Sequence, residues 1–256
     1  MKVVILCGGK GTRMREETEY RPKPLVSIGG KPIIWHIMKI YSSYGINDFI
    51  LCVGYKGDMI KQYFMDMYWR NNDFTLKING SKEINYHTRE EENWNVTIVD
   101  TGIETMTSGR LKQVEKYIDE DEFLFTYGDG LSDIDINKLI EFHRKKGRMS
   151  TLTGVHPISP FGLMEVEDGI VKSFKEKPIL KDMVNGGFMV LNKNIFKYLP
   201  SEDCFFEQSP LINMAKDGQL AVYEHKGFWT AIDTFKDVEA VNKMWGNGEC
   251  EWKVWE

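Results

Sequence analysis

Short apolar runs alternate with longer amphipathic segments along the first half of the chain. The runs predict buried strands at Val3–Leu6, Phe49–Val53, Val96–Val99 and Phe123–Tyr127. Between them, apolar residues recur at helical spacing, which predicts helices at residues 32–44, 58–67, 111–118 and 136–146. Because buried parallel strands form continuous apolar runs, this alternation predicts an α/β fold: a mostly parallel mixed sheet flanked by helices.

The pattern changes after residue 150, where the expected strands become shorter and helices rarer. These strands are Thr151–Val155, Met164–Val166, Val171–Phe174, Phe188–Leu191 and Leu220–Tyr223. Asp168-Gly169 is a hairpin-turn signal between two of them, and a last helix is expected at residues 235–245. We therefore expect one domain over residues 1–256 whose second part is smaller and richer in strands.

Residues 68–95 form the least regular stretch and are rich in Asn, Glu and aromatic side chains. This composition predicts an excursion from the sheet. Two interpretations remain open at this point, an arm at a subunit interface and an ordinary surface hairpin.

Composition and charge limit the classes of protein to which the chain can belong. The chain has 256 residues, is 42% hydrophobic and 28% charged, and carries a net charge of −5. These values are typical of a globular protein with a sizeable core, and they argue against a general nucleic-acid surface. Residues 10–31 are nevertheless locally cationic, which suits a small anionic ligand, although a solvated charged loop would look the same.

The cysteines and the apolar runs indicate the cellular compartment of the protein. Cys7, Cys52, Cys204 and Cys250 show no metal-type spacing, and the first two lie within apolar strands. We therefore expect reduced thiols and a cytoplasmic protein. No run reaches the length that a membrane span needs, and the chain enters a strand at once, without a secretory leader.

A glycine-rich segment follows the first strand directly. It runs Gly8–Arg13, and Lys23-Pro24 comes ten residues after Arg13. Glycines let backbone N–H groups face an anion closely, Arg13 can bridge two phosphate oxygens, and Lys23 can act as a point charge. The segment lacks the Gly-Lys-Ser/Thr ending of a P-loop and the third glycine of a dinucleotide fingerprint. It predicts a phosphate site, with an empty strand-to-helix turn as the alternative.

Two aspartates lie where a metal ion could bind. Asp129 follows the strand Phe123–Tyr127, and ligands of open α/β sheets bind beyond the carboxyl ends of strands. Asp233 comes shortly before the last expected helix. Together the carboxylates suit Mg²⁺, which needs only one or two from the protein. The alternatives are a turn aspartate for Asp129 and a helix N-cap for Asp233.

Two further motifs lie in the second half. Glu176-Lys177-Pro178 follows a strand, and Lys177 could bind a second phosphate while Glu176 accepts sugar hydroxyls. A solvated strand end is the alternative. Asn185-Gly186-Gly187 permits close approach of a ligand and would equally suit a bulge. No nucleophile elbow of the Gly-x-Ser-x-Gly type occurs in the sequence.

In chain order, these motifs resemble those of the sugar-1-phosphate nucleotidylyltransferases. The resemblance rests on Gly8–Arg13, Lys23-Pro24, Gly30–Met38, Val99–Gly102, Met106–Lys112, Phe123–Gly130, Glu176–Pro178, Asn185–Gly187 and Trp252–Glu256. It covers essentially the whole chain. Lys10 and Met14 depart from the family, which usually carries apolar residues such as leucine at these positions.

The resemblance implies a Rossmann-like nucleotidyltransferase fold and a magnesium-dependent transfer from a nucleoside triphosphate to a sugar 1-phosphate. The motifs are most similar to those of members that convert CTP and α-D-glucose 1-phosphate to CDP-glucose and pyrophosphate. It further implies a nucleotide-binding half at 1–150, a sugar-phosphate-binding half at 151–256 and a homo-oligomer. Another nucleotide or acceptor, or a non-catalytic nucleotide-binding module, remains an alternative.

The resemblance also assigns roles to residues of this sequence. The nucleotide is expected to contact Leu6, Cys7, Gly8, Gly9, Lys10, Gly11, Thr12, Arg13, Lys23, Thr105, Arg110 and Gly128. Arg13 and Lys23 are the expected catalytic cations, and Asp129 and Asp233 the expected Mg²⁺ ligands. The sugar phosphate is expected to contact Glu176, Lys177 and Asn185.

The preference for cytosine has a chemical rationale in Arg110. Cytosine presents acceptors at O2 and N3, whereas uracil and thymine present a donor at N3, and an arginine has donors only. An Arg110 that reaches the base edge would therefore favour CTP.

Overall fold

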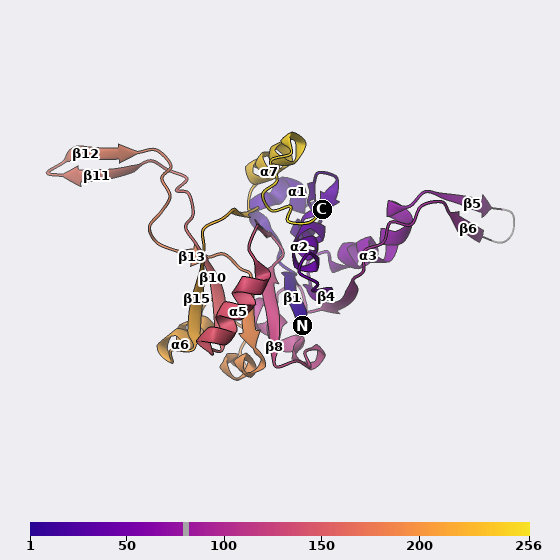
Figure 1. Ribbon diagram of the computed structural model, residues 1–256, viewed down its shortest axis with the longest axis horizontal. Coiled ribbons are helices and arrows are strands. Elements are labelled where there is room, and N and C mark those ends of the chain that lie inside the picture. The colour runs from indigo at the N-terminus through magenta and orange to yellow at the C-terminus, as the bar shows by residue number, and fades with distance from the viewer. Residues whose placement is uncertain (79–81) are drawn as a thin grey trace.

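One central sheet organises the molecule (Figure 1). The computed structural model describes residues 1–78 and 82–256. The strand order is β13-β10-β14-β8-β1-β4-β7, and β15 pairs with β10. The strands are β1 (Lys2–Cys7), β4 (Asp48–Val53), β7 (Asn95–Asp100), β8 (Glu122–Tyr127), β10 (Ser150–Val155), β13 (Val184–Asn185), β14 (Met189–Asn192) and β15 (Leu220–His225). β7, β4, β1 and β8 run parallel, and β14 is antiparallel to β8.

Helices cover both faces of this sheet because successive strand residues point to opposite sides. Val3 and Ile5 pack into one apolar layer, and Val4 and Leu6 into the other. The first layer includes α2 (Ile33–Ser42), α3 (Gly57–Asn71), α5 (Ile136–Lys146) and α7 (Phe235–Asn247). The second includes α4 (Thr107–Gln113), η4 (Lys193–Tyr198) and α6 (Ser209–Lys216). The predicted α/β class is confirmed.

Smaller elements connect the layers. The short helical segments are η1 (Thr12–Met14), α1 (Arg15–Thr18), η2 (Lys23–Leu25) and η3 (Glu115–Tyr117). The two-stranded pairs are β2 (Ser27–Ile28) with β3 (Lys31–Pro32), β5 (Phe74–Ile78) with β6 (Lys82–Tyr86), β9 (Gly130–Ser132) with β16 (Trp229–Ala231), and β11 (Leu163–Glu167) with β12 (Ile170–Lys175).

Two hairpins, β5–β6 and β11–β12, project from opposite sides of the central body (Figure 1). The first is the excursion expected within residues 68–95. The second turns at Asp168-Gly169, where both residues have positive φ, 49° and 77°. Positive φ at both central positions defines a type I′ turn, so the predicted hairpin is confirmed.

Some predicted boundaries were wrong. The helix expected at 111–118 is α4, which begins at Thr107 and ends at Gln113, with η3 following at Glu115–Tyr117. Its start was missed because the first turn buries the polar side chains of Ser108 and Arg110, which apolar periodicity does not detect. The helix expected at 58–67 runs to Asn71. None of the helices among the described residues combines the length and apolar character that crossing a bilayer requires.

Candidate active site

The carboxyl ends of the parallel strands surround a cavity of about 510 Å³. Its walls come from the loops that follow β1, β7 and β8, together with Lys23 and Asp233. Every residue predicted to contact the nucleotide or the metal lines this cavity: Leu6, Cys7, Gly8, Gly9, Lys10, Gly11, Thr12, Arg13, Lys23, Thr105, Arg110, Gly128, Asp129 and Asp233. The fold thus brings together groups that are up to 227 residues apart, from Leu6 to Asp233.

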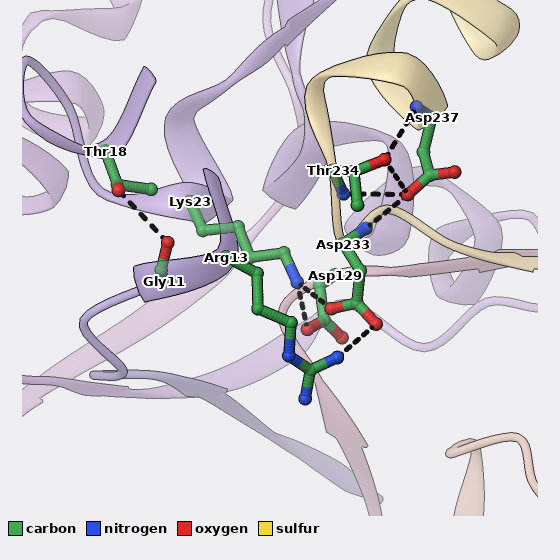
Figure 2. Close-up of polar contacts among 8 residues, drawn as sticks. All are labelled: Gly11, Arg13, Thr18, Lys23, Asp129, Asp233, Thr234 and Asp237. Carbon is green, nitrogen blue, oxygen red and sulfur yellow. Dashed lines mark hydrogen bonds and ion pairs between the residues drawn. The ribbon is translucent and has the colours of Figure 1, made fainter. Parts of the chain in front are cut away.

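Lys23 lies at the centre of the charged groups (Figure 2). Its Nζ is 2.8 Å from Asp129 Oδ2 and 2.8 Å from Asp233 Oδ1. The side chain of Lys23 is only 12% exposed. An ion pair that water reaches poorly is stronger than one in bulk solvent, so Lys23 draws both carboxylates to one point.

Arg13 completes the cluster from the solvent side. Its Nη1 donates to Asp233 Oδ2 at 2.7 Å, and its side chain is 74% exposed. Partial burial alone would raise the pKa of Asp233. The hydrogen bond from Lys23 and the charges of Lys23 and Arg13 outweigh burial, and the pKa lies below its ordinary value. Asp233 is therefore an anion at neutral pH.

The cap of α7 explains why Asp233 is available. Thr234, not Asp233, is the N-cap, and its side chain accepts from Asp237 N. Asp237 in turn accepts from the backbone N–H groups of Asp233 and Thr234, at 3.0 and 2.7 Å. Because this capping box satisfies the helix end, the Asp233 carboxylate faces Lys23 and Arg13 instead (Figure 2). The N-cap alternative for Asp233 is wrong.

The glycine segment turns tightly beside these charges. Gly11 has a φ of 61°, a conformation that favours glycine. Its carbonyl accepts from Met14 N at 2.9 Å and from Thr18 Oγ1 at 3.1 Å. Met14, the departure noted in the sequence, is buried in the apolar layer with β1. It therefore anchors the loop by packing.

Arg110 is held by protein acceptors. Nη1 donates to Thr101 Oγ1 at 2.7 Å and to Val53 O at 3.3 Å, and Nη2 donates to Gly8 O at 3.1 Å and to Ile103 O at 3.3 Å. The residue is 4% exposed, and burial lowers the pKa of its guanidinium. A Cβ at Gly8 would lie 1.9 Å from Nη1. Arg110 therefore joins the glycine segment to β4 and to the loop after β7.

Lys10 pairs across the cavity. Its Nζ lies 2.6 Å from Glu104 Oε1, and both residues line the cavity. Lys10 is 46% and Glu104 82% exposed. The ammonium of Lys10, which departs from the family pattern, is thus paired with a carboxylate in the loop after β7.

The residues predicted for the sugar phosphate lie outside the cavity lining. Asn185 is the nearest, because its Nδ2 donates to the hydroxyl of Tyr127, a lining residue, at 3.3 Å. It ends β13 at a bulge, where Gly186 N donates to Thr153 O and Gly187 has a φ of 74°. Glu176 and Lys177 follow β12 at the base of its projecting hairpin.

Several lining residues gave no sequence signal. Ile103, Glu104 and Phe205 belong to this group. Pro24, Met106, Thr107 and Tyr127 lie within segments that the sequence singled out, but no role in the site was predicted for them. Tyr127 could have been found as the last residue of an apolar strand. Phe205 comes from an irregular segment between η4 and α6, and only the fold brings it to the cavity.

The fold and the cavity are those of a nucleotidyl transferase. A family model described as nucleotidyl transferase matches residues 2–246, and the chain belongs to this family. It is 53% identical over 256 residues to the "Probable glucose-1-phosphate cytidylyltransferase" of Bacillus subtilis (strain 168), with all of both chains covered. It is 48% identical over 258 residues to the glucose-1-phosphate cytidylyltransferase of Salmonella typhi, again with both chains fully covered.

A solved structure shows the same architecture. The crystal structure of HddC from Yersinia pseudotuberculosis superimposes with a TM-score of 0.70 at 25% identity. The match covers 95% of this chain and 99% of that chain.

Proposed function

We propose that the protein transfers a cytidylyl group from CTP to α-D-glucose 1-phosphate, releasing pyrophosphate and CDP-glucose. The observation that carries the proposal is the convergence of Lys23 and Arg13 on Asp129 and Asp233 beside a glycine-rich loop. Full-length relatives named for this activity support the choice of substrates.

The reaction needs no nucleophile from the protein. A phosphate oxygen of the sugar 1-phosphate forms a bond to the α-phosphorus of CTP. The bond from that phosphorus to the oxygen that bridges the α- and β-phosphates breaks, and this oxygen leaves with the pyrophosphate. The task of the protein is to position the reactants and to neutralise charge. Lys23, largely buried, is suited to the α-phosphoryl oxygens, and the exposed Arg13 to the departing pyrophosphate.

Asp129 and Asp233 fit a divalent cation. Their carboxylates come from different segments and converge on one cation, the ammonium of Lys23. Within the part of the chain that the structure describes, no group of three or more His, Cys, Asp or Glu side chains forms a fuller metal cage. Mg²⁺ commonly takes one or two carboxylates and completes its shell with water and phosphate oxygens. Bound there, it would offset negative charge on the triphosphate, and Lys23 would pair with the nucleotide.

The proposed preference for the cytosine base rests on Arg110. The guanidinium lines the cavity and carries positive charge at its inner wall. Nη1 and Nη2 already donate to protein acceptors, so contact of either nitrogen with cytosine requires it to give up one of these acceptors.

The binding site of the sugar 1-phosphate is assigned to Glu176, Lys177 and Asn185, which lie in the second half of the chain. Asn185 has support from its contact with Tyr127 at the cavity wall. Glu176 and Lys177 rest on the family motif and are exposed at the base of β11–β12.

Pyrophosphate release from wild-type protein tests the proposal. CTP, dTTP, UTP and GTP are each combined with glucose 1-phosphate or another sugar phosphate, with magnesium present, and the sugar nucleotide is identified by mass. CTP with glucose 1-phosphate is expected to give the highest kcat/KM. Higher activity with another pair would identify that pair as the substrates instead. Binding without turnover in every pair would indicate a non-catalytic nucleotide-binding module.

We further propose that the protein acts as a homo-oligomer in the cytoplasm. Both projecting hairpins expose apolar side chains, including Ile78, Ile84, Met164 and Phe174. Exposed apolar surface of this kind is typical of protein contacts. The free cysteines Cys7, Cys52, Cys204 and Cys250 suit a reducing compartment. Light scattering is expected to give a mass above 29.8 kDa.

A further inference from the structure

Lys10 and Glu104 form an ion pair between two loops that line the cavity. Lys10 lies between two glycines in the loop after β1, and Glu104 lies in the loop between β7 and α4. β4 separates β1 from β7 in the sheet. The contact of 2.6 Å between Nζ and Oε1 therefore joins the loops that follow two strands that are not neighbours in the sheet.

This pair is accessible to solvent and easily exchanged. Lys10 is 46% and Glu104 82% exposed, and ion pairs with such exposure contribute little net stability because water screens them. Among the described residues, Glu104 is the one side chain that accepts a hydrogen bond from Lys10. A ligand with several negative charges offers Lys10 a stronger partner than one carboxylate does.

The other three lining cations, Arg13, Lys23 and Arg110, differ from Lys10 in their partners. Arg110 donates to Thr101 and to backbone carbonyls. Lys23 and Arg13 pair with Asp129 and Asp233, the carboxylates proposed for the metal. The carboxylate that holds Lys10 has no such second role. Lys10 can therefore leave Glu104 without disturbing the central cluster.

We propose that Lys10 is a further phosphate-binding residue, which exchanges Glu104 for the β- and γ-phosphates of the nucleotide. The inference rests on the proposed function and extends it, since these two phosphates leave as pyrophosphate. Lys10 lines the cavity and is 46% exposed, so phosphates that enter or leave from solvent can reach its ammonium. Glu104 then acts as a competitor that occupies Lys10 until the phosphates arrive.

Titration calorimetry with magnesium present tests this exchange. Affinities for inorganic pyrophosphate, CTP and CMP are measured for wild type, Lys10→Met, Lys10→Arg and Glu104→Gln. Lys61→Met is the matched control, because Lys61 is 41% exposed, pairs with Asp58 on α3 and lies outside the cavity lining. It removes the same charge from the protein.

Lys10→Met is expected to weaken pyrophosphate and CTP binding about tenfold, as loss of one charge-assisted hydrogen bond predicts, and to leave CMP binding unchanged. Lys10→Arg should retain most of the affinity. Glu104→Gln should tighten pyrophosphate and CTP binding about twofold or more, because Lys10 loses its competitor.

Equal effects of Lys10→Met and Lys61→Met would overturn the proposal, because long-range charge would then explain both. An equal loss for CMP and CTP would overturn it too, since Lys10 would then merely shape the loop. Failure of the proposed function is a separate result: wild type would make no CDP-glucose, whatever the binding measurements show.

Discussion

At the scale of single residues, Lys23 holds two carboxylates that would otherwise repel each other. Each oxygen lies 2.8 Å from its ammonium, and the pKa of Asp233 is lowered despite partial burial. The three groups therefore depend on one another. A substitution at any of them changes the charge presented to the phosphates at the same point.

Asp129→Asn removes one proposed metal ligand and keeps the shape of the side chain. We expect kcat to fall by at least about a hundredfold, as for loss of a main electrostatic contact in the transition state. The melting temperature should change little, because Asp129 is 34% exposed. Pyrophosphate release and calorimetry measure the two effects, with the exposed carboxylate variant Asp58→Asn as control. Near-normal turnover would show that the metal is held elsewhere.

Arg110→Met tests whether Arg110 supports the loop or reads the base. The change removes four buried hydrogen bonds, to Thr101 Oγ1 and to the carbonyls of Gly8, Val53 and Ile103. Gly8 O and Val53 O still accept from Tyr55 N and Thr101 N, and we expect a loss of about 2–4 kcal/mol in unfolding free energy by urea titration. A purely supporting role lowers kcat/KM for CTP and UTP alike. A preference for CTP that shrinks by about 1–3 kcal/mol would assign base reading to Arg110.

At the scale of elements, local signals decided what the sequence could predict. α5 was predicted at its observed bounds because Asp135 caps its start and Gly147, with a φ of 57°, ends it. The start of α4 was missed because its first turn buries polar groups. The same contrast holds at the site. The residues directly after β1 and β8 were predicted. Glu104 was missed although its loop follows β7, and Phe205 reaches the cavity only through tertiary structure.

The capping box of α7 gives a prediction at this scale. Thr234→Ala removes the side chain that accepts from Asp237 N and is expected to lower the unfolding free energy by about 1 kcal/mol. Thr234→Ser keeps the hydroxyl and should restore it. Urea denaturation compares the two variants. If alanine and serine give the same stability, the cap does not hold the segment that carries Asp233.

At the scale of the whole molecule, a buried aromatic cluster joins the C-terminal segment to α2. His36 lies 5.1 Å from Trp245, between ring centroids, and Trp252 Nε1 donates to His36 Nδ1 at 3.4 Å. His36 Nε2 donates to Ile28 O at 2.9 Å. Ile28 belongs to the β2–β3 pair that follows Lys23. The cluster therefore ties the end of the chain to the segment that presents the central lysine.

Burial lowers the pKa of His36 from 6.5 to about 4, so the folded protein holds it neutral. The unfolded chain binds its proton below pH 6.5 and the folded chain only below about 4. Stability is therefore expected to fall by about 3 kcal/mol as the pH drops through this window. Urea titrations from pH 7 to 4 measure it. In His36→Gln, the unfolding free energy should no longer show this decrease between pH 6.5 and 4. An unchanged pH dependence in that variant would assign the effect to other groups.

The contact between Gly8 and Arg110 limits how this site can evolve. A Cβ at position 8 would lie 1.9 Å from the Arg110 guanidinium, which also approaches Gly54. A side chain can therefore enter position 8 only after position 110 has become smaller, and each single change passes through an unfit intermediate. Two positions 102 residues apart should consequently vary as a pair among proteins of this fold, and a library that randomises either one alone should return mainly the native residue.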